Sequence, residues 1–191
     1  MKYIKTYENA FNYNVDIFTN KEAAELYRTY YYKYNYEYDL RSKIHYFREF
    51  DPWSSSENYD KSSRFIVAYN DDDIIGICHI ANYDSSDHWA ISYCSTNKDY
   101  FQKGISKRLL EECFKYFSEN YPNETLHFSG YSVEGWKYFR KYILEFANKY
   151  NVKIEEQGVG YPGPTGKQGD EFYDLVRTSN AEVKKLYGKR Y

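Results

Sequence analysis

The sequence predicts an α/β domain with a mixed, mostly antiparallel sheet flanked by helices. Three observations support this prediction: a hairpin of two apolar strands, a glycine between a third strand and a long amphipathic helix, and a second helix between two further strands. A tight hairpin pairs antiparallel strands, whereas a strand joined to its neighbour through a crossover helix pairs with it in parallel. One sheet therefore contains both kinds of pairing. The length of 191 residues suits a single domain with a small appendage.

The central part of the chain has the clearest periodicity. Short apolar runs bounded by turn residues predict strands at 64–69, 74–83, 89–96, 125–129 and 152–156. Apolar residues at helical spacing predict helices at 105–120 and 134–150. The run Asp71–Asp73 between the first two strands is expected to be a solvated hairpin tip rather than a metal site.

The two ends of the chain are less regular. We expect a short strand at 3–7 and a helix at 21–34 with Asn20 as its N-cap. The tyrosines between positions 27 and 38 fit helical and strand spacing equally well, and we favour the helix at 21–34 with a looser segment to 40. A second short helix is expected at 41–50, and Asn180 can cap a last helix at 181–187. The Gly- and Pro-rich stretch 158–169 is expected to be a loop.

Charge and composition exclude several classes of protein. Lys and Arg number 26 against 28 Asp and Glu, so a general nucleic-acid binder or a polybasic membrane-surface protein is not expected. No apolar run is long enough to span a membrane, and the first residues lack the apolar core of a signal peptide. Cys78, Cys94 and Cys113 are widely spaced among apolar residues, which indicates free thiols and no zinc site. We therefore expect a cytoplasmic protein.

Tyrosine is unusually abundant, with 26 residues. Tyrosine codons are AT-rich, so genome composition is the preferred explanation of the abundance, ahead of a functional one. Such a composition suits a low-GC bacterium or a bacteriophage, in which case the cytoplasm is that of the host. An exposed tyrosine surface is also compatible with a homodimer.

The segment between the third strand and the long helix has the features of a phosphate site. Gly104 and Ser106 are small enough for close approach of an anion to the first turn of the helix, whose amides lack partners. Lys103, Lys107 and Arg108 add positive charge nearby. The segment is neither a P-loop nor a dinucleotide-binding fingerprint. A tight turn without a ligand has the same pattern, so the segment alone does not decide between a phosphate site and an ordinary turn.

The run Tyr100–Leu110, YFQKGISKRLL, resembles the acetyl-CoA-binding motif of the GNAT (GCN5-related) N-acetyltransferase family, Arg/Gln-x-x-Gly-x-Gly/Ala. The hairpin at 64–80 resembles the second and third strands of that family, and residues 64–157 follow its order of elements. The resemblance implies the acyl-CoA N-acyltransferase fold for residues 1–157, with 158–191 as a Gly-rich loop and C-terminal helical extension. It also implies acetyl-CoA as the cofactor.

Position by position, the motif is incomplete. Gly104 and Ser106 take the two small-residue positions, whereas Phe101 stands where Arg or Gln is usual and Gln102 lies one residue later. In the family this loop offers mainly backbone amides to the pyrophosphate, and the preceding strand end lies along the pantetheine arm. The expected cofactor-binding residues are Cys94, Ser95, Thr96, Phe101, Gln102, Lys103, Gly104, Ile105, Ser106 and Lys107.

The catalytic groups are less evident. The family often uses a Glu of the central strand as base, but residues 89–96 contain no carboxylate. Family members often have a Tyr in the helix after the next strand that protonates the leaving thiolate. The best register puts Phe139 at that position, which leaves Tyr131 and Tyr138 as candidate acids. The candidate bases are His79, Asp87, His88 and His127, with interior packing as the other reading of His79 and His127 and a water chain as a further route.

The function that the resemblance implies is transfer of an acetyl group from acetyl-CoA to a primary amine of a small molecule or a protein, without a metal. The segments expected to form the acceptor site, 20–50 and 158–191, are rich in Tyr and contain Asp170, Glu171 and Asp174. An aromatic and acidic rim suits a cationic amine, although the same tyrosines can pack on the sheet. The alternatives are an inactive scaffold that binds CoA or a protein, and an enzyme that uses another donor such as succinyl-CoA.

Overall fold

The computed structural model describes residues 12–35, 39–44, 63–82, 88–128 and 133–156. The expected strand at 3–7, the loop at 158–169 and the helix at 181–187 lie outside these residues. Across the described ranges, no helix combines the length and the apolar character that a membrane span requires.

Six strands and five helices make up the described part of the chain. The strands are β1 (Asn14–Phe18), β2 (Ser63–Tyr69), β3 (Ile74–Asn82), β4 (His88–Thr96), β5 (Thr125–Phe128) and β6 (Lys153–Glu156). The helices are α1 (Asn20–Lys33), α2 (Leu40–Lys43), a 3₁₀ turn η1 (Lys98–Tyr100), α4 (Ile105–Asn120) and α5 (Val133–Tyr150). The five strands and two long helices expected in the central part are therefore all present.

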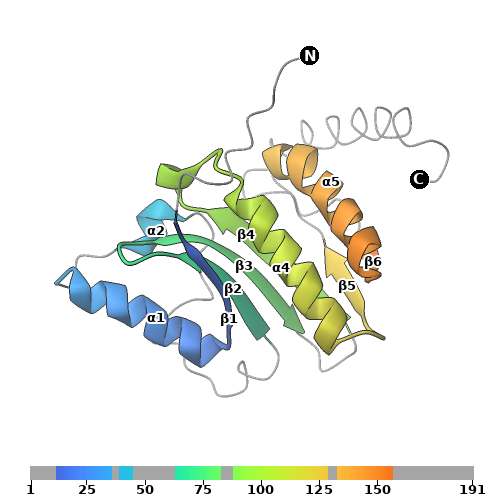
Figure 1. The fold of residues 1–191 in the computed structure, drawn as a ribbon, viewed down its shortest axis with the longest axis horizontal. Helices are drawn as coiled ribbons and strands as arrows, with labels where there is room; N and C mark the ends of the chain where they lie inside the picture. Colours follow the sequence, from blue (N-terminus) through green and yellow to red (C-terminus); the bar gives the residue numbers. More distant parts are fainter. Residues whose placement is uncertain (1–11, 36–38, 45–62, 83–87, 129–132, 157–191) are drawn as a thin grey trace, which may run out of the picture.

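The six strands form one sheet in sequence order, β1-β2-β3-β4-β5-β6. The pairs β1–β2, β2–β3 and β3–β4 are antiparallel, and the pairs β4–β5 and β5–β6 are parallel. Helix α4 connects the first parallel pair and α5 connects the second (Figure 1). The expectation of a mixed, mostly antiparallel sheet flanked by helices is confirmed.

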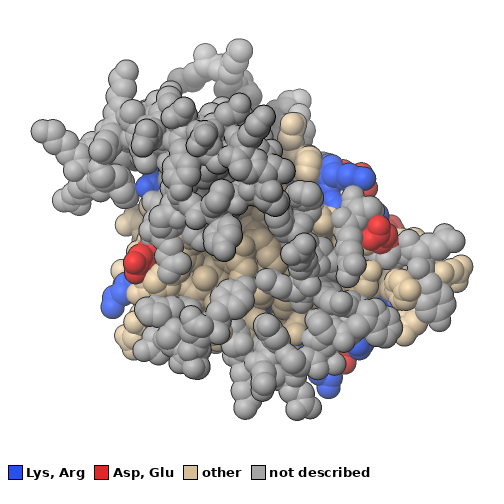
Figure 2. Space-filling model, turned by 180° about the vertical axis from the view of Figure 1, so that it is seen from behind, with Lys and Arg blue, Asp and Glu red and all other residues tan. Residues whose placement is uncertain are grey.

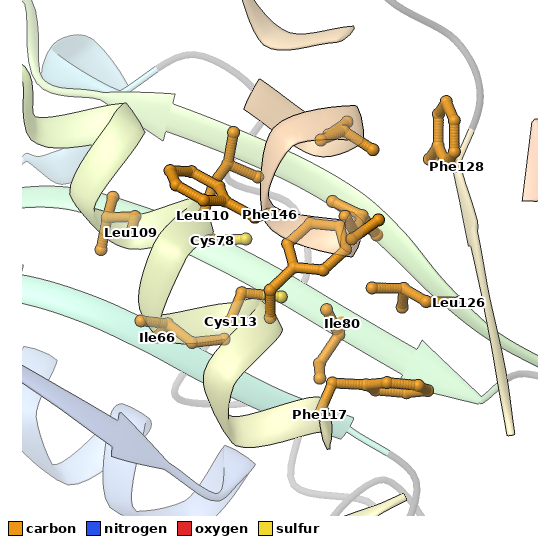
Figure 3. Close-up of a cluster of buried hydrophobic side chains, with 14 of the residues drawn as sticks. Ile66, Cys78, Ile80, Leu109, Leu110, Cys113, Phe117, Leu126, Phe128 and Phe146 are labelled. Carbon is orange, nitrogen blue, oxygen red and sulfur yellow. The ribbon is translucent and has the colours of Figure 1, made fainter. Parts of the chain in front are cut away.

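The larger core lies between the sheet and the helices α4 and α5, which run side by side (Figure 1). Figure 3 shows side chains from both layers meeting there, with Phe117 of α4 beside Ile80 and Leu126 of the sheet. Each such side chain contributes roughly 1.5–3 kcal/mol when it is fully removed from water. This packing holds α4 at a fixed height against β3 and β4.

Gly76 of β3 allows α4 to approach the sheet closely. A Cβ at this position would lie 3.0 Å from Cδ1 of Leu109, 3.1 Å from Cγ2 of Ile105 and 3.1 Å from the Ser95 carbonyl oxygen. All three contacts are tighter than ordinary van der Waals contact. The glycine therefore sets the distance between the first turns of α4 and the end of β4.

A smaller core on the other face of the sheet holds α1. Its buried members are Ala23, Tyr30, Leu40, Ile44, Phe65, Val67, Ile74 and Ile77. The hydroxyl of Tyr30 donates to the Asn70 carbonyl oxygen at 2.5 Å, and that of Tyr34 donates to the Asp72 carbonyl oxygen at 2.7 Å. The prediction of a helix in this tyrosine-rich segment is confirmed up to Lys33. The hydroxyls of Tyr30 and Tyr34 connect the end of α1 to the tip of the β2–β3 hairpin by hydrogen bonds.

The structure corrects three local expectations near the N-terminus. Thr19, not Asn20, is the N-cap of α1, and it forms a capping box with Glu22 in which each side chain bonds the other residue's backbone amide. The strand β1 was not expected. The short helix α2 ends at Lys43, whereas positions 45–50 of the helix expected there lie outside the described residues.

Candidate active site

The described pairing of β4 with β5 ends before β4 does. Their paired residues run from His88 with Thr125 to Ile91 with Phe128, where β5 ends, while β4 continues to Thr96. On the other side of β4, the register shifts so that His79 pairs with Tyr93 and Ile80 pairs with Ile91. The extra residue between them is a β-bulge, which bends the strand at the level where β5 ends. Beyond that level, the β4 edge extends past the end of its described neighbour.

The loop after β4 contains two backbone conformations in the left-handed region. Gln102 has a φ of 64° and Gly104 has a φ of 76°, and Gly104 is the N-cap of α4. A Cβ built on Gly104 would meet no atom within 4 Å. The backbone angle, rather than crowding, thus favours glycine here, and among the described residues nothing occupies the space above it.

The first turn of α4 faces this open space. The first bond of the helix runs from the amide of Arg108 to the carbonyl oxygen of Gly104 at 3.1 Å, so the amides of Ile105, Ser106 and Lys107 precede the regular helical bonding. The helix dipole adds a partial positive charge at the same place. An open glycine, a turn of amides and a strand edge that leads to them fit an elongated ligand with phosphate at one end, as acetyl-CoA is.

The basic side chains of this loop differ in the groups that they contact. Nζ of Lys103 lies 5.0 Å from the ring centroid of Tyr100, and Nζ of Lys107 lies 5.4 Å from that of Tyr142 on α5. Arg108, which the sequence placed with them, instead pairs with Glu112 at 2.6 Å. The charge of Arg108 is compensated along the helix by Glu112, so Lys107, at the first turn of α4, is a better candidate for a phosphate than Arg108.

Phe101 stands out in the same loop because its side chain is 61% exposed. It occupies the position where the resemblance leads one to expect Arg or Gln. Gln102, the neighbouring polar residue, is also exposed. The loop therefore offers an aromatic surface and backbone amides rather than a guanidinium group.

The end of β4 joins this loop through side chains. The hydroxyls of Thr96 and Ser106 lie 2.5 Å apart, and Sγ of Cys94 lies 3.9 Å from the Ser106 carbonyl oxygen. Ser95 is half-buried and its carbonyl faces Gly76. The residues expected to bind the cofactor, 94–96 and 101–107, thus lie at one end of the sheet, as adjoining parts of one surface.

Two further cysteines lie below Cys94. Cys78 is its partner across the β3–β4 ladder, and Cys113 faces Cys78 from α4 (Figure 3). Both are fully buried free thiols. The hydrogen bond with Cys113 lowers the pKa of Cys78, but the Cys94 thiol and burial outweigh it, so the pKa lies well above its ordinary value. The hydrogen bond with Cys78 and burial likewise raise the pKa of Cys113, so both thiols are protonated at neutral pH. Within the described residues, no group of His, Cys, Asp and Glu is arranged to hold a metal.

The candidate proton-transfer residues lie in different places. His79 is 3% exposed, and its ring stacks on Phe65 with centroids 4.3 Å apart and lies 5.4 Å from the Tyr93 ring. This position is on the α1 face of the sheet, beside the bulge of β4. His127 is also buried, and its Nδ1 lies 3.7 Å from the Glu155 carboxylate on the next strand.

The remaining candidates are described only by their backbone or not at all. Tyr138 lies in α5 and His88 begins β4, but their side chains are outside the described part. Tyr131 and Asp87 lie outside the described residues altogether. Their parts in catalysis remain predictions from the sequence.

The expected acceptor side is described only in part. On α1, the rings of Tyr27 and Tyr31 stack with centroids 6.1 Å apart, and Tyr32 is 54% exposed. Figure 2 views the molecule from behind, where the described charged side chains lie around the margin and uncharged ones occupy the visible centre. The acidic segment at 170–174 lies outside the described residues.

The structure also shows polar residues that the sequence did not point to. Asp73, expected in a solvated tip, is 5% exposed and forms an ion pair with Lys43 at 2.9 Å. Asn97, which follows β4, is fully buried and bonds Asp73. An Asn between a strand and a turn is a common capping signal, and this was the available indication of its role.

Several solved structures are similar to this chain. Escherichia coli ElaA has a TM-score of 0.48 at 11% identity and covers 69% of this chain and 86% of its own. A ribosomal-protein-alanine N-acetyltransferase from Brucella melitensis biovar Abortus 2308 has a TM-score of 0.45 at 12% identity, covering 79% and 97%. An aminoglycoside acetyltransferase from an uncultured soil metagenomic sample has a TM-score of 0.43 at 14% identity, covering 78% and 94%.

Sequence comparison identifies the family. No curated protein is significantly similar to the chain as a whole. The family described as "Acetyltransferase (GNAT) family" matches residues 20–128, a span that runs from the start of α1 to the end of β5 and so contains the strand opening and the glycine loop. The chain therefore belongs to the GNAT acetyltransferase family.

Proposed function

We propose that this protein transfers an acetyl group from acetyl-CoA to a primary amine of a small molecule or a protein. The observation that supports this proposal most is the continuous surface from the open β4 edge to the amides of the first α4 turn, with Gly104 at its centre. Family membership supplies the acetyl-CoA chemistry, and this surface supplies the shape and polarity for that ligand.

In this proposal each part of the surface has a separate task. The amides of residues 105–107 and the lysines 103 and 107 hold the pyrophosphate. Residues 94–96 follow the pantetheine arm with their backbone groups, as an added strand would. The β4 bulge brings a backbone amide to the thioester carbonyl, where a donor stabilises the oxyanion that develops during attack.

The reaction forms a bond between the amine nitrogen and the acetyl carbon, and it breaks the bond between that carbon and sulfur. The nitrogen loses one proton and the sulfur gains one. We propose Tyr131 and Tyr138 as donors to the sulfur. His79 is the proposed acceptor from nitrogen, because it lies beside the bulge and its ring is held between Phe65 and Tyr93.

The experiment measures release of free CoA from acetyl-CoA with a panel of primary amines: polyamines, aminoglycosides, lysine peptides and peptide N-termini. Mass spectrometry of the amine confirms that it carries the acetyl group. Transfer that depends on the amine and is lost in Ser106→Asp supports the proposal. Binding of acetyl-CoA without transfer to any amine contradicts it and favours the inactive scaffold.

Variants then assign the proton transfers. Loss of a positioned acid or base costs about 10²–10⁴-fold in rate. If His79 is the base, His79→Gln lowers kcat by about this factor, and Tyr138→Phe does so if Tyr138 is the acid. An unchanged kcat in both variants would contradict these assignments without affecting the cofactor site.

A further inference from the structure

Three polar side chains form a connected series beneath the cofactor loop. Nζ of Lys43 on α2 lies 2.9 Å from Oδ2 of Asp73, at the start of β3. Nδ2 of Asn97 donates to the same Oδ2 at 3.0 Å. Asp73 is 5% exposed and Asn97 is 0% exposed, so the contacts lie in the interior, where a misplaced polar atom is costly.

Asn97 uses each of its polar atoms. Its amide donates to the Ile75 carbonyl oxygen at 2.8 Å, and its Nδ2 also donates to that of Ile74 at 3.2 Å. Its Oδ1 accepts from the Asp99 amide at 3.1 Å, and its own carbonyl oxygen accepts from the Tyr100 amide at 2.9 Å. One residue therefore ties the start of β3 to the turn η1.

The turn η1 leads directly into the candidate pyrophosphate loop. It ends at Tyr100, and residues 101–104 follow before α4 begins. At its far end the loop is held by the bond between Thr96 and Ser106. The loop is thus fixed at both ends, by Asn97 at its entry and by Ser106 at its exit.

Asp73 determines which way the Asn97 amide points. An ionised carboxylate only accepts hydrogen bonds, so the NH₂ group must face Asp73 and the oxygen must face the Asp99 amide. The opposite orientation would put two acceptors together at Asp73 and two donors together at η1. Lys43 compensates the charge of Asp73 in this interior site.

We propose that Asn97 is a positioning residue for the cofactor loop, and that the Asp73–Lys43 pair holds it in the one orientation that shapes η1. The inference rests on the proposed function and deepens it. It assigns cofactor affinity partly to residues that the cofactor does not touch.

Asn97→Asp is the sharpest variant, because it changes a donor into an acceptor without a change of shape. It keeps the oxygen that accepts from Asp99 but puts a carboxylate oxygen against Asp73. We expect the Kd for acetyl-CoA to rise at least about tenfold, which corresponds to ~1.4 kcal/mol. The kcat at saturating acetyl-CoA should change less than about threefold, since no reacting atom is touched.

The double variant Asp73→Asn/Asn97→Asp exchanges donor and acceptor across the same pair. The amide introduced at position 73 can then donate to the carboxylate introduced at position 97, which removes the contact between two carboxylates. The exchange also turns an NH₂ group toward Nζ of Lys43 and leaves the Ile74 carbonyl oxygen facing a carboxylate, so the expected recovery is partial. A Kd at least about threefold lower than that of Asn97→Asp alone would support the proposal. Asp72→Asn is the matched control. Asp72 is the exposed neighbour of Asp73 in the same hairpin, and its described ion pair is with Lys33.

A second measurement works without any ligand. Hydrogen exchange of the amides at 98–106 should become faster in Asn97→Asp and slow again in part in the double variant, while the amides of β2 are unchanged. If the original protein does not bind acetyl-CoA, the proposed function fails, and exchange still decides whether Asn97 orders the loop. If the original protein binds acetyl-CoA and Asn97→Asp changes neither Kd nor exchange, the positioning role is overturned.

Discussion

The hydroxyl oxygens of Thr96 and Ser106 lie 2.5 Å apart and join the last residue of β4 to the first turn of α4. This bond closes the loop whose amides face the open space above Gly104. It also places the Ser106 side chain in the first turn of α4. A negative charge there would stabilise the helix but would repel the pyrophosphate of the proposed ligand.

Ser106→Asp should separate fold stability from cofactor binding. A carboxylate in the first turn of a helix is favourable by about 0.3–1 kcal/mol, so the melting temperature should be equal or higher. The same charge repels a pyrophosphate, and the Kd for acetyl-CoA should rise at least about tenfold. Calorimetric titration and thermal unfolding measure the two effects. Ser106→Ala is the control, and tight binding by Ser106→Asp would contradict the location of the pyrophosphate.

Gly76→Ala should destabilise the fold through crowding. The added methyl group meets Leu109, Ile105 and the Ser95 carbonyl within 3.1 Å, and the helix has to move to accept it. Overpacking of this kind costs about 1–3 kcal/mol, which denaturant unfolding measures. Because α4 and the end of β4 move apart, acetyl-CoA affinity should fall as well.

Gly104→Ala is the informative comparison for Gly76→Ala. Its methyl group has open space, but the φ of 76° is unfavourable for alanine. We expect a cost of about 1 kcal/mol from backbone strain alone. A Gly76→Ala variant as stable as the original protein would show that α4 does not pack as closely as described.

Lys107→Gln should weaken binding of acetyl-CoA and reduce its dependence on salt. Its ammonium group is held over Tyr142 near the amides of the first turn of α4, and exposed charges act over a screening distance of about 10 Å at 0.1 M salt. The Kd should rise about threefold to tenfold at low salt and less at high salt. Lys115→Gln is the matched control on the same helix, because Lys115 is exposed but far along α4. Equal effects of the two variants would contradict a local role.

Cys94 should react with iodoacetamide before the other two thiols. It is half-buried, whereas Cys78 and Cys113 are fully buried and have raised pKa values, so they carry little thiolate at pH 8. Mass spectrometry of peptides measures the order, with unfolded protein as the reference. Acetyl-CoA should slow the reaction of Cys94, and an unchanged rate in its presence would place the ligand away from β4.

The order of elements could be predicted from the sequence because each signal was local. The change from an apolar strand through Gly104 to an amphipathic helix predicted α4 with the observed bounds. The crossover helices predicted the two parallel pairings. The strand β1 was missed although residues 14–17 alternate between polar and apolar, because so short a segment is a weak signal and its pairing with β2 joins positions about fifty residues apart.

The site depended on contacts that sequence spacing does not show. The bulge in β4 comes from a shift of register against β3, and Asp73 is buried because Lys43 and Asn97, both distant in sequence, meet it. The pairing of Arg108 with Glu112 is different. The two residues are four positions apart on one helix face, so their ion pair could be predicted from the sequence. With that ion pair in view, Arg108 is not a candidate for the phosphate site.

The most direct test of the cofactor site is thermal unfolding with acetyl-CoA, beside CoA and ATP. A ligand at 100 times its Kd stabilises a protein by about 2.7 kcal/mol, which for a chain of this size raises the melting temperature by roughly 5–10 °C. The account predicts such a rise with acetyl-CoA and CoA, none with ATP, and none in Ser106→Asp with any of them. No rise at millimolar acetyl-CoA would contradict the assignment of the β4 edge and the α4 terminus as its binding site.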